Sequence, residues 1–293
     1  NVLFCKNCGL VQIGYVVDPE KMFTNYLYVT SYSSTMVEHL KDFAFEVVKI
    51  ASAKKNSLVI DIGSNDGTFL RHFKKMGFEV LGIEPAKNIA KTAIENGIRT
   101  ENIFFNKKNA ELILKKYGKA KIITGTNVFA HVHDLDGLVE GVKIILEDDG
   151  FFAIESPYLA DLLEKNEFDT IYHEHLSYLS LKPLIVFFKR HGMTVIDVKR
   201  TQIHGGSIRL YVKKDQLNLK QKKSVQNLMK FEEKKGIHSF EIFERFSDNV
   251  MKLKKEAVLL FKKLKQQGKT IAGYGASAKG NTLLNYFDLK NDT

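Results

Sequence analysis

The sequence contains few of the residues and patterns that define disulfide-rich, fibrous or membrane-spanning proteins. Only 2 of its 293 residues are Cys, too few for a disulfide framework, so an oxidising compartment is not implied and we expect a cytoplasmic protein. The low counts of 4 Pro and 20 Gly exclude a collagen-like or proline-rich fibre. No apolar run approaches the ~18 residues that span a bilayer, so the sequence predicts no membrane segment.

The composition is instead that of a globular protein with a sizeable core. Hydrophobic residues make up 44% of the chain and charged residues 27%, and the length suggests about two domains. No signal peptide is recognisable, and the chain begins at Asn1 rather than at an initiator Met. Because it ends at Thr293, shortly after a glycine-rich turn, we expect a fragment of a longer protein.

Positive charge is concentrated in the C-terminal part of the chain. The net charge is +10, and the segment from Lys213 to the end, with 18 basic and 9 acidic residues, contributes +9. Apolar residues recur at helical spacing between the lysines from about Leu217 to Gln267, which predicts one or two amphipathic helices. The simplest interpretation is a solvated helix face whose Lys stems lie on apolar surface. Nucleic-acid binding is the sharper alternative, but no nucleic-acid motif accompanies the lysines, so we expect no such partner.

Short apolar runs alternate with helical patterns between Ser57 and about Lys213. This alternation predicts βαβ units, and therefore an α/β fold with a parallel sheet covered by helices on both faces. A helix is predicted over 34–53, and the runs 194–198 and 207–212 are close enough to pair antiparallel. The four runs predicted as parallel strands are 58–62, 79–83, 121–124 and 150–154.

A glycine turn follows the first of these strands. The run D-I-G-S-N-D-G at 61–67 ends the strand and opens a helix, whose free backbone N–H groups can bind a ligand. A dinucleotide motif reads G-x-G-x-x-G, whereas the spacing here is D-x-G-x-N-x-G, so a nicotinamide cofactor is disfavoured. Asn65 stands at the middle glycine position and tolerates positive φ better than most residues. Glu84 ends the second strand and is well placed for ribose hydroxyls at the carboxyl edge of the sheet.

These two loops together resemble the cofactor motifs of class I S-adenosylmethionine (SAM) methyltransferases. The resemblance implies a Rossmann-like methyltransferase fold with SAM as cofactor. It implies that the first-strand acid and the glycine loop hold the methionine part, and that Glu84 holds the ribose. The residues carried over to the cofactor site are Asp61, Gly63, Asn65, Gly67 and Glu84, with Asn127 as support.

Histidine and tyrosine gather in four segments, at 26–34, 127–134, 171–178 and 204–207. The second and third lie where a doubly wound sheet has its active site, outside the carboxyl ends of strands. The zinc-protease motif H-E-x-x-H fails, because the residue four places after His173 is a Ser. His131 and His133 could form part of a metal site, although the SAM-type fold does not require one. Each of these histidines could also be an ordinary core or surface residue.

The order of these motifs resembles the sugar C-methyltransferases of deoxysugar biosynthesis, which methylate C3 of a nucleotide-linked 4-keto-deoxysugar. Y-H-E-H at 172–175 with S-Y at 177–178, and H-G-G-S-I-R at 204–209, carry the resemblance. The run C-K-N-C-G-L-V-Q at 5–12 matches the second half of that family's zinc module. The run G-Y-G-A-S-A-K-G-N-T at 273–282 matches the opening turn of its C-terminal Rossmann-like domain, so the resemblance extends nearly from end to end.

The resemblance divides the chain into four parts. We expect a partial zinc-binding module at 1–20, a helical substrate-lid segment at 21–56, the methyltransferase domain at 57–213, and at 214–293 a helical linker with the start of a truncated Rossmann-like domain. Structural zinc takes four ligands, and only Cys5 and Cys8 are present here, so the metal site is incomplete. A redox C-x-x-C is the alternative, but no βαβ pattern surrounds it.

The implied substrate sets the expected chemistry. A carbon beside a ketone becomes nucleophilic when a base of near-neutral pKa removes its proton and the enolate oxygen is stabilised. His175 is the predicted base because imidazole titrates near pH 6.5. The other predicted acceptor-site residues are Glu174 to orient the sugar or the base, Tyr172 and Tyr26 as hydrogen-bond donors, His131 against the sugar, and Tyr28 and His204 as further substrate contacts.

Two other classes of function remain open from the sequence. An O- or N-methyltransferase acting on another sugar or small metabolite could use the same histidines as base. A binding protein could use the basic helices to hold nucleic acid or an acidic partner, with a steep salt dependence as its signature. The sugar, the nucleotide and the oligomeric state are not specified by any of these residues.

Overall fold

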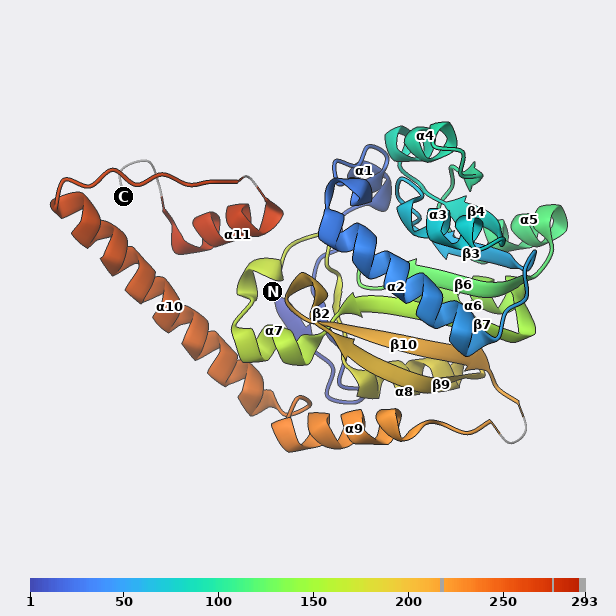
Figure 1. The fold of residues 1–293 in the computed structure, drawn as a ribbon. Helices are drawn as coiled ribbons and strands as arrows, with labels where there is room; N and C mark the ends of the chain where they lie inside the picture. The colour runs from blue at the N-terminus through green and yellow to red at the C-terminus, as the bar shows by residue number, and fades with distance from the viewer. Residues whose placement is uncertain (217–218, 276, 290–293) are drawn as a thin grey trace.

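A seven-stranded sheet organises the chain in the computed structural model, which describes residues 1–216, 219–275 and 277–289 (Figure 1). The strand order is β5-β4-β3-β6-β7-β10-β9. The first five strands in this order are parallel, whereas β10 is antiparallel to both β7 and β9. The strands are β3 (Leu58–Ile62), β4 (Glu79–Ile83), β5 (Thr100–Glu101), β6 (Ala120–Thr126), β7 (Leu146–Pro157), β9 (Met193–Thr201) and β10 (Ser207–Lys214).

The strand predictions from the apolar runs are confirmed. The runs at 58–62 and 79–83 are strands with those limits, and the runs at 121–124 and 150–154 lie inside longer strands. The later runs pair antiparallel as expected, for example at Ile208 and Arg200. The chain order reverses between β3 and β6, which is the switch point where α/β sheets bind ligands at the carboxyl ends of their strands.

Helices cover both faces of this sheet, so the parallel strands are buried on both sides. One face carries α2 (Ser34–Ala51) and α3 (Thr68–Lys75), whose aromatic and aliphatic side chains form one core cluster. The opposite face carries α5 (Lys107–Tyr117), α6 (Leu135–Ile145) and α8 (Leu181–Arg190), which contribute to the larger cluster. The helix predicted over 34–53 is therefore confirmed, although it ends two residues earlier.

The N-terminal segment joins the sheet domain through a small second sheet. It forms β1 (Val2–Phe4) and β2 (Val11–Ile13) around the Cys turn, as the sequence predicted short strands there. A third strand, β8 (Ser177–Tyr178), pairs with β2 and comes directly after the Y-H-E-H run. The Cys turn is thereby attached to the segment that carries the predicted base.

The C-terminal part forms an arm of helices. The described residues form α9 (Lys223–Lys235), which packs on β9, and α10 (Phe240–Gln266), which leads away from the body (Figure 1). After α10 the chain turns, and α11 (Ala278–Phe287) lies back toward the body. The amphipathic helices predicted from about Leu217 to Gln267 are therefore confirmed as two helices, α9 and α10. The predicted start at Leu217 lies outside the described residues, as does Ala276 in the glycine-rich run 273–282.

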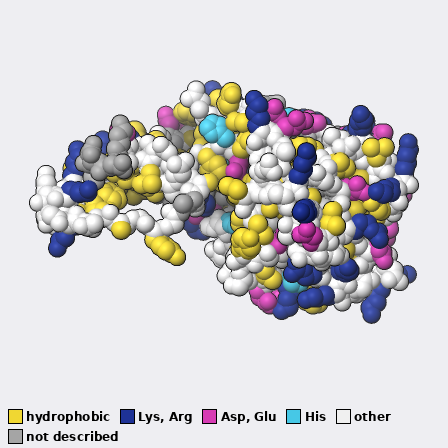
Figure 2. Space-filling view, turned by 90° about the horizontal axis from the view of Figure 1, so that it is seen from above, with side chains coloured by type: hydrophobic (Ala, Val, Ile, Leu, Met, Phe, Trp, Pro, Cys, Tyr) yellow, Lys and Arg dark blue, Asp and Glu magenta, His cyan; other side chains and the backbone are white. Residues whose placement is uncertain are grey.

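The surface of the body carries charges of both signs. On the face shown in Figure 2, Lys and Arg side chains are interspersed with Asp and Glu. Among the described residues, none of the helices is both long enough and apolar enough to cross a membrane.

Candidate active site

The loop between β3 and α3 has the backbone shape that close approach of a ligand requires. Gly63 and Gly67 have φ of +67° and +77°, a conformation that glycine adopts without strain. A Cβ at Gly63 would collide with Val128, and one at Gly67 would lie 2.7 Å from Cγ1 of Ile98. Both glycines predicted from the sequence are therefore required by the packing of this loop.

Two buried acids stand at the carboxyl ends of adjacent strands. Asp61 is 1% exposed and accepts a 2.6 Å hydrogen bond from Oγ1 of Thr124, yet burial raises the pKa of its carboxyl to about 7. Glu84 is 5% exposed and accepts from the backbone N–H groups of Asn65 and Ala86, each at 2.9 Å. Burial also raises the pKa of Glu84, against these two donors.

Buried polar atoms without protein partners surround these acids. Within the described residues they include Oγ of Ser64, Oδ2 of Asp66 and Oδ1 of Asn127. Buried polar groups are nearly always hydrogen-bonded, so such atoms fit a polar ligand with amino and hydroxyl groups, as SAM has. Asn127 directly follows β6 with φ of +55°, and its N–H donates to the carbonyl of Glu155 at 2.7 Å. The sequence analysis missed Asp66 as a site residue, although a second acid inside the glycine loop was visible.

Three of the four segments rich in His and Tyr, at 26–34, 127–134 and 171–178, come together beside Asp61, Glu84 and the glycine turn, which we call the cofactor edge. The rings of His131 and His175 lie 5.1 Å apart, and the ring of Tyr172 lies 4.4 Å from His175. Phe23 stacks on His131 from the other side, at 6.0 Å. The loop after β6 is joined to the 171–178 segment because the carbonyl of Ala130 accepts from the N–H groups at 176 and 177. We call His131, Tyr172, Glu174, His175 and Tyr26 the acceptor cluster.

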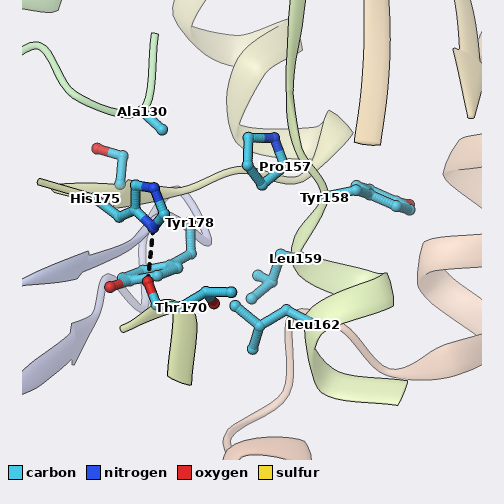
Figure 3. Close-up of a pocket in the computed structure, with 9 residues that line it drawn as sticks. Ala130, Pro157, Tyr158, Leu159, Leu162, Thr170, His175 and Tyr178 are labelled. Atoms are coloured by element: carbon cyan, nitrogen blue, oxygen red, sulfur yellow. Dashed lines mark hydrogen bonds between the residues drawn. The ribbon is translucent and has the colours of Figure 1, made fainter. Parts of the chain in front are cut away.

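The ring of His175 is fixed in one tautomer. Its Nδ1 lies 2.7 Å from the carbonyl oxygen of Thr170, a contact drawn in Figure 3. A carbonyl oxygen only accepts, so Nδ1 carries the hydrogen and Nε2 keeps a free lone pair. Burial lowers the pKa of His175, although the Thr170 carbonyl opposes this shift. The imidazole is therefore neutral near pH 7, which is the form that a general base needs.

The tyrosines of the site are held as hydrogen-bond donors. The hydroxyl of Tyr26 donates to Oε2 of Glu174 at 3.2 Å. Burial and then the charge of Glu174 raise the pKa of Tyr172 to about 12, so its hydroxyl stays protonated. Tyr178 lines the small cavity beside His175 in Figure 3, and its buried hydroxyl has no partner among the described residues. It was not predicted as a site residue, although it stood in the quoted motif.

The structure places the two remaining predicted substrate residues outside the acceptor cluster. Tyr28 lies over the cofactor loop, where burial and then the charge of Asp66 raise the pKa of its hydroxyl. His204 is exposed in the turn before β10, where its φ is +53°.

An ion network that the sequence did not indicate supports the end of β7. Glu155 is 1% exposed and lies 2.6 Å from Nε2 of His39 and 2.7 Å from Nη2 of Arg209. Burial alone would raise the pKa of Glu155, but these two partners hold it below its ordinary value. Because the carbonyl of Glu155 also accepts from Asn127, the network braces the loop that follows β6. Arg209 ends the H-G-G-S-I-R run, so it is the one member of this network that stood in a sequence motif.

The Cys turn holds the two thiols that the sequence predicted as zinc ligands. The N–H of Gly9 donates to the carbonyl of Cys5 at 2.8 Å, which brings Cys5 and Cys8 to one side of a tight turn. Hydrogen bonds from Cys8 and Asn7 lower the pKa of Cys5, whereas burial raises that of Cys8. In the part of the chain that the structure describes, no three His, Cys, Asp or Glu side chains gather as metal ligands. Two thiols do not complete the four-ligand set of structural zinc, so zinc does not fit these residues alone.

The reversed strand order, the glycine turn after β3 and the buried acids at the carboxyl ends of β3 and β4 define a class I SAM-dependent methyltransferase. Comparisons with known proteins agree with this class. A family model described as a methyltransferase domain matches residues 36–198, and one described as a C-methyltransferase C-terminal domain matches 202–293. The C-methyltransferase NovU of Streptomyces niveus is 34% identical over 284 residues, which are 97% of this chain and 68% of that protein. The chain belongs to the C-methyltransferase family and is a SAM-dependent enzyme.

Solved structures resemble the sheet domain at low sequence identity. Magnesium protoporphyrin IX methyltransferase from Synechocystis PCC 6803, with bound S-adenosylhomocysteine (SAH), is 12% identical, with a TM-score of 0.49 over 65% of this chain and 90% of that one. The YcgJ protein of Bacillus subtilis is 15% identical, with a TM-score of 0.45 over 61% of this chain and all of that one. The assignment therefore rests on the strand order, the family models and NovU.

Proposed function

We propose that this enzyme methylates carbon 3 of a nucleotide-linked 4-keto-deoxysugar, with His175 as the general base. The observation that carries the proposal is the fixed tautomer of His175, whose Nε2 lone pair stands within the acceptor cluster. A sugar hydroxyl or amine already has a lone pair, whereas a ring carbon must first lose its proton. C-methylation therefore has the greater need for a positioned neutral base.

The chain's own residues account for the remaining requirements of carbon acid chemistry. Nε2 of His175 takes the proton from the carbon beside the ketone. The protonated hydroxyl of Tyr172 donates to the oxygen on which the enolate charge develops. Burial lowers the pKa of His131 to about 3, and any protonation of the neighbouring His175 lowers it further, so His131 is a neutral hydrogen-bonding group.

The cofactor edge supplies binding and alignment. When bound, SAM would supply an electrophilic methyl group, with S-adenosylhomocysteine as the leaving group. Glu84 would accept hydrogen bonds from the ribose hydroxyls, and the glycine turn would admit the methionine part to the backbone. Holding both reactants at fixed distance contributes much of the rate enhancement. The nucleotide diphosphate is the expected anionic part of the substrate, and Lys279 offers it a positive charge. Lys279 lies close enough to His175 and His204 for its charge to lower the pKa of both imidazoles.

The test is an isotope experiment on the wild-type chain. A nucleotide-linked 4-keto-deoxyhexose is incubated with enzyme and SAH in D₂O, and the C3 signal is followed by NMR. We expect enzyme-dependent exchange of the C3 proton, and transfer of a methyl group to C3 when SAM replaces SAH. Methylation of an oxygen or nitrogen with full retention of the C3 proton would overturn the proposal.

A further inference from the structure

A segment that contains no strand, and is helical only where Thr30 begins a short 3-10 helix (Thr30–Tyr32), crosses the cofactor loop and carries Tyr26 to the acceptor cluster. We call residues 24–30 the strap. It follows α1 (Pro19–Phe23), which lies beside α4 (Lys87–Glu95) in Figure 1. Phe23, just before the strap, stacks on His131 at 6.0 Å, and the Tyr26 hydroxyl contacts Glu174 at 3.2 Å. The strap therefore forms one wall of the acceptor cluster.

Two asparagine side chains hold the backbone of the strap. Asn88 accepts from the N–H of Tyr26 at 3.1 Å and donates Nδ2 to the carbonyl of the same residue at 2.7 Å. Asn65 donates Nδ2 to the carbonyl of Tyr28 at 3.0 Å and accepts from the N–H of Thr30 at 2.9 Å. A side-chain amide offers one acceptor and donors much as a peptide group does, so each Asn takes the place of a neighbouring strand.

The position of Asn65 shows why this residue is not glycine. Its φ of +49° lies in the left-handed region, where glycine is the least strained choice and Asn the next. A glycine would satisfy the loop but would leave the carbonyl of Tyr28 and the N–H of Thr30 without these bonds. The backbone N–H of Asn65 also donates to Glu84, the carboxylate placed for the ribose. Asn65 therefore contacts both the carboxylate of Glu84 and the strap.

We propose that Asn65 and Asn88 are positioning residues that couple cofactor binding to the docking of the strap, and so to the placement of Tyr26 over the acceptor site. A cofactor that steadies Glu84 and Asn65 favours the docked strap, and the docked strap favours the cofactor equally, because such coupling is reciprocal. The role of Tyr26 toward an acceptor rests on the proposed function. The coupling itself involves only the cofactor and this chain.

The experiment measures amide hydrogen exchange of the strap in the full chain, with and without SAH as the probe. In the wild type we expect SAH to slow exchange at Tyr26 and Thr30 by about tenfold. Asn88→Ala removes both bonds to Tyr26, and Asn65→Gly keeps a backbone that tolerates positive φ while removing both bonds to the strap. Loss of a bond pair should speed exchange of the released amide by about tenfold, given typical net hydrogen-bond energies. Each variant should also lose most of the protection that SAH gives.

Asn96→Ala is the matched control, because Asn96 is exposed at the end of the same helix as Asn88 and has no bond to the strap. It should exchange as the wild type does. Unchanged strap exchange in both variants, or a wild-type strap that SAH does not slow, would overturn the proposal. Loss of SAH binding in Asn65→Gly with wild-type exchange at Thr30 would make Asn65 a cofactor residue alone. Failure of the sugar assignment leaves every one of these outcomes unaffected, so the two proposals can fail separately.

Discussion

The cofactor edge and the acceptor cluster occupy the same end of the sheet but are built in different ways. Asp61, Glu84 and the glycine turn come from two consecutive βα loops, and the hydrogen bonds of the two acids run within those loops or to the adjacent strand. The acceptor cluster brings together the strap, the loop after β6 and the segment before β8, which are far apart in the sequence. In the function proposed above, the local part would bind a cofactor common to many enzymes, whereas the assembled part would supply the chemistry particular to this reaction. Variants in one part that leave the strap, Asn65 and Asn88 unchanged should therefore leave the function of the other part intact.

The strongest test of that separation is His175→Ala. Removing a general base lowers the rate by a typical factor of ~10²–10⁴, so methyl transfer and C3 proton exchange should both fall in this range. Titration calorimetry should still show wild-type affinity for SAH, because the cofactor edge is untouched. His173→Ala is the control, since His173 lies in the same run but is exposed, and its ring lies 6.2 Å from that of Tyr15 and nearly perpendicular to it. Undiminished proton exchange in His175→Ala would remove it from the role of base.

Glu84→Ala is the converse test. Hydrogen bonds to a charged group contribute ~1.5–3 kcal/mol, so the affinity for SAH should fall by about 10- to 100-fold. Glu101→Ala provides the comparison, because Glu101 ends the next strand but is paired with Lys116 rather than facing the glycine loop. Equal loss of affinity in both variants would mean that Glu84 acts through the stability of the sheet edge and not through the ribose.

The same contrast explains what the sequence could predict. The glycine turn and Glu84 were predictable because short-range spacing places them at strand ends, and the structure has them there. His131 and His175 could be grouped only through the expected sheet topology. The contacts of Asn88 with Tyr26, and of Thr170 with His175, had no pattern in the sequence, because they depend on how loops pack after the sheet has formed. Glu155 with His39 and Arg209 is a long-range network of the same kind.

The pH dependence sharpens the assignment of the base. A base works in its neutral form, and burial lowers the pKa of His175, so kcat/KM should rise through a midpoint below the ordinary value of about 6.5. The positive charge of Lys279 contributes to this lowering. Lys279→Met should therefore move the midpoint to higher pH by less than about one unit, whereas Lys279→Arg should leave it in place. A midpoint that does not respond to Lys279→Met would contradict this electrostatic link.

The last prediction concerns Asp61 and the stability of the cofactor edge. Burial raises the pKa of Asp61 from its ordinary value near 4 to about 7, so the folded state binds a proton that the unfolded state has lost between these two values. Stability should consequently fall as the pH rises from about 4 to 7, and the whole penalty is present above that range. Asp61→Asn cannot ionise and still accepts a hydrogen bond from Thr124, so its Tm should change less over the same range. Thermal unfolding of both proteins at pH 5 and pH 8 measures the difference, and a wild-type Tm that rises more steeply than that of the variant would contradict it.

The affinity for SAM should also depend on the charge of Asp61. Because SAM is a cation at its sulfonium and amino groups, it should favour ionised Asp61 and bind more tightly above pH 7 than below pH 6. The uncharged variant should not show this difference in affinity.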